Sequence, residues 1–274
     1  MTQSDNPSLR VAIGGFGAIG RSIAAFLDAG VAGLKLVAVS AKNIEKAQEH
    51  INSLSQSVPV VSLGELAGLA DVVVECAPAA VFDDIAEPAI NDGLIFVPLS
   101  VGALLSRSAL IEKAEQTGAR IIVPTGALIG LDAVRAAAEG EIHSVKLVTR
   151  KPPQGLEDAP YLIENKISLK NLSEPLRVFE GTAREGTKGF PANVNVAAAL
   201  SLAGIGPDKT RIEIWADPSV DRNIQHVEVE ADSARFEMTI ENVPSPENPR
   251  SGRITALSAI AALRGLVSPL KVGT

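Results

Sequence analysis

Three glycines near the start of the chain have the spacing G-x-G-x-x-G, at Gly15, Gly17 and Gly20. They follow an aliphatic run typical of a buried strand, 9–13, and precede helical apolar periodicity over 18–28. In this context the first glycine permits a tight turn, the second lets a diphosphate approach the backbone, and the third lets the helix lie close to the strand. The N–H groups and dipole of the helix N-terminus would bind the phosphates. The pattern predicts a dinucleotide site, against the alternative of a turn with no ligand, formed by Gly15, Phe16, Gly17, Ala18, Ile19 and Gly20.

The end of the second expected strand, 34–39, bears on which dinucleotide binds. An enzyme specific for NAD usually has an acidic residue about 20 positions after the glycines, which holds the ribose 2′-hydroxyl. Here the sequence continues with Ser40, Ala41, Lys42 and Asn43. These residues supply a hydroxyl, a cation and an amide, but no acidic group. We therefore expect Ser40 and Lys42 to contact the ribose and NADP to be accepted, alone or with NAD. The alternative is a solvated loop in which Lys42 points to water.

These residues sit in a regular alternation of strands and helices. The expected strands are 9–13, 34–39, 71–75, 94–98 and 120–123, and the helices between them are 18–28, 43–54, 63–67, 81–90 and 106–116. Such alternation indicates an α/β fold, a doubly wound parallel sheet of the Rossmann type. We expect this dinucleotide-binding domain to span 1–125 and to be completed by a C-terminal helix within 252–274.

The regular alternation of strands and helices ends in the second half of the chain. Strands are expected at 145–149, 177–181, 211–216, 225–230 and 234–241, with one helix at 193–203. The pattern predicts a smaller α+β domain over 126–251 with an antiparallel or mixed sheet, which would bind substrate and mediate dimerisation. A sheet face left open by so few helices predicts a homodimer.

Composition excludes several classes of protein. The net charge is −7 and no basic block occurs, so nucleic-acid binding has little support. No apolar stretch reaches the roughly 20 residues that span a membrane, and the single cysteine fits a reducing cytoplasm, so we expect a cytoplasmic protein. Cys76 itself is typical of a small buried hydrophobe, since no histidine near it in sequence would make it a nucleophile. Three scattered histidines and one cysteine predict no metal site.

Segments spread along nearly the whole chain resemble the L-aspartate dehydrogenase family. The most specific are Glu180-Gly181-Thr182-Ala183-Arg184 and Phe190-Pro191-Ala192-Asn193-Val194-Asn195-Val196. Further matching segments are 15–20, 74–77, 100–104, 126–132, 216–218 and 241–245.

The resemblance implies NAD(P)-dependent oxidation of L-aspartate to iminosuccinate, which hydrolyses to oxaloacetate and ammonia, or the reverse reductive amination. It also implies that Ala127 and Asn195 contact the cofactor. Cys76, Ala77 and Ser100 follow the carboxyl ends of expected strands, where open α/β sheets bind ligands, so we predict that they line the same site.

The chain departs from the family pattern at one position. The resemblance implies a catalytic histidine in the pattern Asn-x-His-x-Ile, but ungapped alignment places Gln225 there and His226 one residue later. Neighbouring strand residues point to opposite faces, and glutamine cannot take up a proton near neutral pH. Three interpretations stay open: a β-bulge brings His226 into the site, Gln225 only binds while water or lysine handles protons, or the substrate has changed.

A dicarboxylate substrate needs cations at both ends. The candidates are Arg150, Lys151, Arg184 and Lys188. Asn193 and Asn195 stand at the start of an expected helix, where capping of the helix accounts for one of these two asparagines without any ligand. Two other functions remain open from the sequence. One is an imine reductase or amine dehydrogenase acting on a related small carbonyl compound, and the other is a non-catalytic protein that senses NAD(P).

Overall fold

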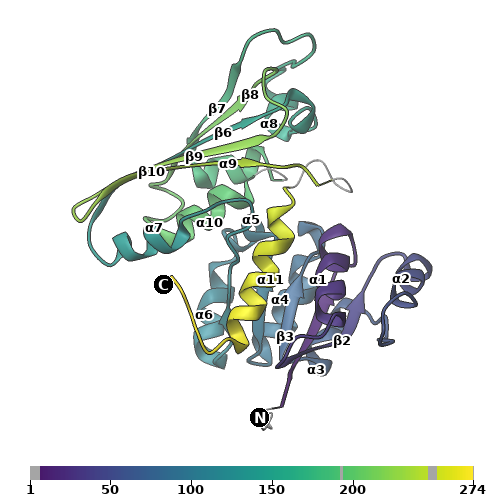
Figure 1. The fold of residues 1–274 in the computed structure, drawn as a ribbon. Helices are drawn as coiled ribbons and strands as arrows, with labels where there is room; N and C mark the ends of the chain where they lie inside the picture. Colours follow the sequence, from purple (N-terminus) through teal and green to yellow (C-terminus); the bar gives the residue numbers. More distant parts are fainter. Residues whose placement is uncertain (1–6, 192–193, 246–251, 274) are drawn as a thin grey trace. The chain divides into compact units, whose positions relative to one another are not determined.

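The computed structural model describes residues 7–191, 194–245 and 252–273, and the chain forms two compact units (Figure 1). The first contains 1–124 and 256–270, and the second contains 125–255 and 271–274. The sequence placed these divisions at 125/126 and 251/252. Asn193 lies outside the described residues.

The first unit is built on a fully parallel sheet with strand order β2-β1-β3-β4-β5. The strands are β1 (Leu9–Gly14), β2 (Leu34–Ser40), β3 (Val72–Glu75), β4 (Ile95–Pro98) and β5 (Arg120–Ile121). The helices are α1 (Ala18–Asp28), α2 (Ile44–Ile51), α3 (Leu66–Leu69), α4 (Phe82–Asn91), α5 (Val101–Leu104) and α6 (Ser108–Thr117), with 3₁₀ turns η1 (Leu63–Glu65) and η2 (Ala79–Val81). The order reverses between β1 and β3, the switch point where such sheets bind ligands.

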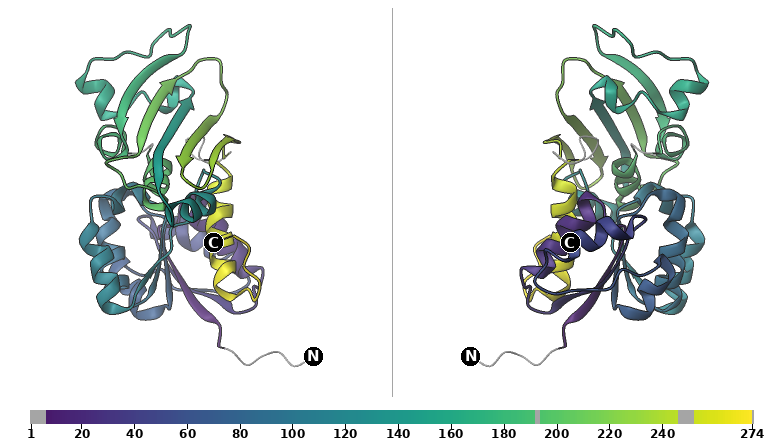
Figure 2. Two further views of the ribbon diagram at one scale, coloured as in Figure 1. Left: turned by 90° about the vertical axis from the view of Figure 1, so that its left-hand side faces the viewer. Right: turned by 90° about the vertical axis from the view of Figure 1, so that its right-hand side faces the viewer.

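Helices cover both faces of this sheet (Figure 2). On one face α1 and α11 (Ile254–Val267) pack against β1, where Ile23 and Leu263 share a core with Val11. On the other face α3, α4 and α6 pack around Phe82 and Phe96. The predicted Rossmann fold is confirmed.

The second unit is built on a mixed sheet with strand order β10-β9-β6-β8-β7, in which only the β6–β8 pair is parallel. Its strands are β6 (Ile142–Lys151), β7 (Leu176–Thr182), β8 (Arg211–Ala216), β9 (Asn223–Ala231) and β10 (Arg235–Asn242). Alternation along β6 buries one face of the sheet, with Val145 and Leu147 almost fully covered, and leaves the other face partly exposed. The predicted smaller domain with a mixed sheet is confirmed.

The expectation of a single helix here was wrong. Besides α10 (Asn195–Ala203), the unit contains α7 (Leu131–Ala138), α8 (Pro160–Glu164), α9 (Ala183–Gly189) and a 3₁₀ turn, η3 (Pro153–Gly155). Helix α9 forms despite two glycines because Thr182 and Glu185 make a capping box. Its Gly186 sits so close to Ile212 of β8 that an added Cβ would overlap that side chain. Within the described part of the chain, no helix is long and apolar enough to cross a membrane.

Candidate active site

The glycine turn joins β1 to α1 at the switch point of the first sheet. Gly15 has a φ of +100°, and a Cβ there would lie 2.6 Å from the carbonyl oxygen of Cys76, while a Cβ on Gly20 would overlap the carbonyl oxygen of Gly15. Gly17 is different, because it is exposed and nothing lies within 4 Å of the position of its Cβ. Packing within the chain therefore explains Gly15 and Gly20 but not Gly17.

Gly17 is also the N-cap of α1, and no side chain caps that helix and no acid stands in its first turn. The helix therefore presents backbone N–H groups and its positive dipole end beside a backbone position that has room for a ligand. This arrangement fits a diphosphate.

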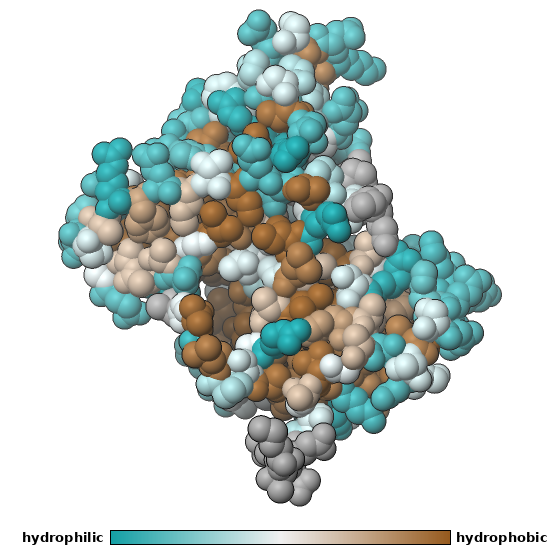
Figure 3. All heavy atoms as spheres, in the orientation of Figure 1, coloured by the Kyte–Doolittle hydropathy of each residue, from teal (hydrophilic) through white to brown (hydrophobic). Residues whose placement is uncertain are grey.

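The end of β2 lies next to this turn, since Gly15 donates its N–H to the carbonyl of Ser40 (3.0 Å). Ser40 is buried, Lys42 is exposed, and Asn43 caps α2 by accepting the N–H of Lys46. Figure 3 shows hydrophilic side chains gathered over α2. The amide of Asn43 is thus explained by capping, which leaves Lys42 as the exposed cation of the loop.

The sequence interpretation missed a pair of side chains behind this loop. Arg21, in the first turn of α1, donates from Nη1 to Nε2 of His50 (2.6 Å), and His50 packs edge-on against Phe16. His50 is partly buried and fixed by these contacts. Its position at the end of α2, 29 residues from Arg21, gave no local signal of the pairing.

Glu75, the last residue of β3, is a second group that the sequence interpretation missed. Its carboxylate is fully buried and accepts the backbone N–H groups of Ala77, Leu99 and Ser100 and the hydroxyl of Ser100 at 2.8–3.1 Å. Burial raises the pKa of Glu75, and these four hydrogen bonds to the carboxylate oppose that rise. Glu75 thereby ties the carboxyl ends of β3 and β4 together and orients two of the predicted cofactor residues, Ala77 and Ser100.

Cys76 follows on β3 and packs against the core that contains β1 and α1. Burial, with a smaller contribution from the neighbouring Glu75 carboxylate, raises the pKa of its thiol well above the ordinary value. A thiol held neutral is a poor nucleophile, so the chemistry agrees with the reading of Cys76 as a small apolar side chain.

The second unit contains the other two predicted cofactor residues. The carbonyl oxygen of Ala127 accepts a hydrogen bond from Nδ2 of Asn242 (3.1 Å). Asn195 is the exposed first residue of α10, and the N-cap is Val194, whose side chain cannot cap. Capping therefore does not account for Asn195.

Gln225 and His226 lie on opposite faces of the second sheet. Gln225 is 3% exposed, and its Oε1 accepts the hydroxyl of Thr149 on β6 at 2.6 Å. His226 is on the partly exposed face, where Nδ1 is 2.7 Å from the hydroxyl of Thr239 and Nε2 is 3.5 Å from Glu228. The pairing of β9 with β6 and β10 runs through both residues without a shift. The suggested bulge is therefore wrong, and His226 does not take the place of Gln225.

The structure separates the four candidate cations. Arg150 stacks on Trp215 and pairs with Asp217 on the partly exposed face, Arg184 pairs with Asp208, and Lys188 is exposed. Lys151 alone among the four is buried, 6% exposed, and the alternation of β6 puts it on the same face as Thr149. Burial lowers the pKa of Lys151 from 10.5 to about 8.

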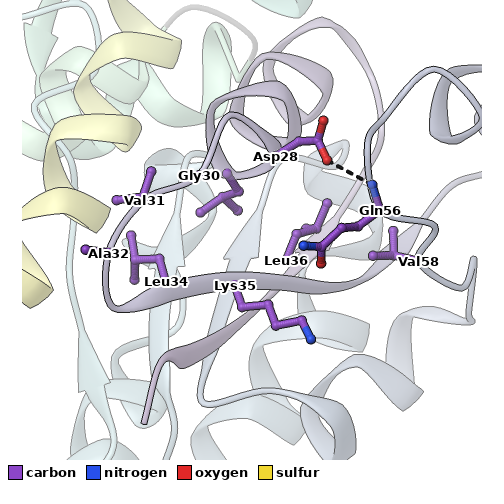
Figure 4. A pocket seen from close by; sticks show the side chains of 10 residues that line it. Asp28, Gly30, Val31, Ala32, Leu34, Lys35, Leu36, Gln56 and Val58 are labelled. Atoms are coloured by element: carbon purple, nitrogen blue, oxygen red, sulfur yellow. Dashed lines mark hydrogen bonds between the residues drawn. The ribbon is translucent and has the colours of Figure 1, made fainter. Parts of the chain in front are cut away.

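Two surface pockets lie apart from these groups. One, of about 260 Å³, is lined by Leu34 and Lys35 of β2 and by Val58, among others, at the amino end of β2 and so away from the glycine turn (Figure 4). The other, of about 580 Å³, is lined in the second unit by Pro152, Lys170 and Pro218 among others. Within the ranges that the structure describes, no group of three histidine, cysteine or acidic side chains could hold a metal ion.

The whole sequence matches a family of known proteins. Over 272 residues it is 56% identical to an L-aspartate dehydrogenase of Bradyrhizobium diazoefficiens, in an alignment that covers 99% of this chain and 96% of the relative. The chain belongs to the L-aspartate dehydrogenase family. L-aspartate dehydrogenase 3 of Bordetella bronchiseptica is 53% identical over 272 residues, covering 99% of this chain and all of the relative. The resemblance inferred from the sequence segments is confirmed.

Two domain models match the chain. Residues 132–266 match the C-terminal domain of aspartate dehydrogenase, and residues 15–124 match the NAD-binding domain of homoserine dehydrogenase. The crystal structure of aspartate dehydrogenase from Thermotoga maritima has the same fold, with a TM-score of 0.75 at 24% identity over 97% of this chain and 99% of that one. In this L-aspartate dehydrogenase family member, the nucleotide-binding features thus lie in the first unit and the buried polar groups of β6 and β9 in the second.

Proposed function

We propose that this chain is an NAD(P)-dependent dehydrogenase that interconverts L-aspartate and iminosuccinate, with oxaloacetate and ammonia as the products of hydrolysis. The observation that carries the proposal is the 56% identity over 99% of the chain with an L-aspartate dehydrogenase. The first unit would be the cofactor domain and the second the domain for substrate binding and dimerisation.

The residues around the glycine turn would hold the cofactor. When bound, the nicotinamide supplies the acceptor for the hydrogen and electron pair that leave the substrate carbon. Gly17 and the first turn of α1 would bind the diphosphate, and Glu75 would hold Ala77 and Ser100 in place beside it. From the family resemblance, Ala127 and Asn195 would also contact the cofactor.

Gln225 would bind the substrate rather than carry a proton. The hydrogen bond from Thr149 fixes the amide with Oε1 toward β6, so the two N–H donors of Nε2 are at its other end. A buried amide with a fixed orientation can donate to a carboxylate of aspartate, and it does so with the same strength at every pH near neutrality.

The loop after β2 supports the use of NADP as well as NAD. This region offers the hydroxyl of Ser40, the ammonium of Lys42, and the guanidinium and imidazole of the Arg21–His50 pair. Residues 40–43 contain no carboxylate that would repel a 2′-phosphate. Titration with NADPH and NADH should show the Lys42→Ala variant losing affinity for NADPH much more than for NADH. Equal losses for both would assign Lys42 to solvent.

We propose that the active form is a cytoplasmic homodimer. Helix α11 is predominantly apolar, yet only Ala259 and Leu263 of its residues are fully buried, and Leu257 is 59% exposed. Figure 3 shows hydrophobic side chains over α11. Helices of this composition are usually covered, and the second sheet also has a partly exposed face bearing Trp215. Sedimentation showing only a monomer at micromolar concentration would contradict the dimer.

The activity is tested by following reduced cofactor with L-aspartate and NAD(P)⁺, and its consumption with oxaloacetate and ammonia. The proposal expects turnover in both directions. Turnover with another small carbonyl compound plus an amine, but not with these substrates, would point to an imine reductase or amine dehydrogenase. Tight NADPH binding without turnover of any of them would point to a sensor.

A further inference from the structure

Lys151 is a buried lysine at the end of β6, and the nucleotide-binding features do not account for it. It is 6% exposed, and its backbone carbonyl accepts the N–H of Asp217 at 2.8 Å, which fixes the end of the strand against β8. Burying a lysine carries a free-energy cost, because an ammonium loses its hydration.

Its position relates it to Gln225. Thr149 and Lys151 are two apart on β6, so their side chains share a face with Cβ atoms about 6.5 Å apart. Thr149 is directly opposite Gln225 in the β6–β9 pairing and bonded to it. The long side chain of Lys151 therefore starts on the same buried face, beside the position where the family resemblance implies a histidine.

The charged groups of the neighbouring strands do not set the ionisation of Lys151. Asp217 beyond β8 is bonded to Arg150 and Ser219, and on β9 both His226 and Glu228 are on the opposite face. The remaining titratable side chains of the packed elements are engaged elsewhere or exposed. They are Glu230 on β9, Glu180 and Arg177 on β7, Arg211 and Glu213 on β8, Tyr161 and Glu164 on α8, and Arg184, Glu185 and Lys188 on α9. Desolvation alone lowers the pKa of Lys151 to about 8, so neutral and charged forms coexist in mildly alkaline solution.

We propose that Lys151 is the catalytic base that takes the proton from the substrate ammonium, the task for which Gln225 lacks a titratable group. This inference rests on the proposed aspartate dehydrogenase activity. Neutral Nζ accepts one proton from the α-ammonium of aspartate. The freed amine lone pair then forms the C=N bond while the Cα–H bond breaks, and the hydrogen leaves with its electron pair to the oxidised cofactor, which is reduced. Iminosuccinate remains in its protonated iminium form (C=NH2⁺), and Lys151, now an ammonium, returns its proton to solvent.

The competing role for Lys151 is a fixed cation that holds a substrate carboxylate. The two roles require opposite charge states in the oxidative direction, because a base must be neutral and a carboxylate ligand must be charged. Arginine satisfies only the second role, since its guanidinium does not deprotonate in proteins. Replacement by arginine therefore discriminates between them.

The experiment compares wild type, Lys151→Arg, Lys151→Ala and the control Lys146→Met, a lysine on the same strand whose side chain is on the other face and pairs with Glu213. Fluorescence titration with NADPH reports whether each variant is folded. The pH dependence of kcat for aspartate oxidation is measured, and Lys151→Ala is assayed with added methylamine and ethylamine.

For the base role, wild-type kcat rises through an ionisation near pH 8, and both Lys151 variants lose about 10²–10⁴-fold while still binding NADPH. Lys146→Met behaves as wild type, and the amines restore turnover to Lys151→Ala. If Lys151→Arg keeps its kcat and pH profile, or if no amine restores Lys151→Ala, the base role is overturned. A wild type that does not turn over aspartate at all overturns the proposed function itself, which is a distinct result.

Discussion

The hydroxyl of Thr149 donates to Oε1 of Gln225 at 2.6 Å across the β6–β9 pair, and both side chains are buried. Thr149→Val would leave the amide oxygen without its partner inside the sheet, at a cost of about 1–3 kcal/mol in the free energy of unfolding. Because the amide would also lose its orientation, we expect a higher KM for aspartate. Urea unfolding and steady-state kinetics measure the two effects. Thr149→Ser keeps the hydroxyl and should restore most of both, and a Thr149→Val variant with wild-type KM would contradict the binding role of Gln225.

His226 should contribute nothing to the chemical step, because it is bonded to Thr239 on the face opposite Gln225. His226→Gln is therefore expected to leave kcat, KM and the pH profile for aspartate unchanged. Gln225→His, in contrast, places an imidazole with an ordinary pKa of about 6.5 on the buried face. In the Lys151→Met background it should recover part of the lost turnover and show an ionisation below pH 8. Loss of turnover in His226→Gln alone would show that the assignment of faces is mistaken.

Gly17 and Gly20 offer a matched pair of substitutions that separates ligand binding from packing. Gly17 has a φ of −79°, which alanine adopts freely, and there is open space where the Cβ of an alanine would lie. Gly17→Ala should therefore fold normally. A methyl group facing the diphosphate should weaken NADPH binding about tenfold or more. Gly20→Ala collides with the carbonyl oxygen of Gly15 and should cost about 1–3 kcal/mol of stability.

Thermal unfolding and NADPH titration of the two variants test this pair. Unchanged NADPH affinity in Gly17→Ala would remove the reason for assigning the diphosphate to this turn.

Much of the fold could be predicted from the sequence because its signals are local. The helix over 18–28 and the strand over 211–216 were predicted to the residue. Helix α9 was missed because its two glycines outweigh its weak apolar pattern, although Thr182 and Glu185 give a readable capping signal three residues apart.

The site was less predictable because it depends on contacts between distant segments. The alternation in β9 placed Gln225 and His226 on opposite faces, but the sequence did not show which face was buried or whether a bulge intervened. Arg150 and Lys151 look alike as neighbouring cations, and only the packing of β6 separates a paired surface arginine from a buried lysine. In the sequence, Glu75 is only a polar residue at the end of a strand. Its role depends on the N–H groups of Leu99 and Ser100, which follow β4 and donate to its carboxylate.

Burial of Lys151 also predicts how stability depends on pH. Its pKa is about 8 in the folded protein against 10.5 ordinarily, so the folded state binds fewer protons between these values. Below about pH 8 the charged, buried lysine destabilises the protein by about 3 kcal/mol, and this penalty shrinks as pH rises toward 10.5. Lys151→Met should therefore be more stable than wild type at pH 7, by an amount that declines in alkaline solution. Denaturant unfolding of both proteins at several pH values measures the difference, and a constant difference would contradict the buried charge.

We propose that this chain oxidises L-aspartate with a nicotinamide cofactor held at the glycine turn. The most direct measurement is the absorbance of reduced cofactor formed by the purified protein from L-aspartate with NADP⁺ or NAD⁺ in mildly alkaline buffer. We predict formation that requires L-aspartate and falls sharply in the folded Gly17→Ala variant at limiting cofactor. A folded wild-type protein that binds NADPH and forms no reduced cofactor from L-aspartate would contradict it.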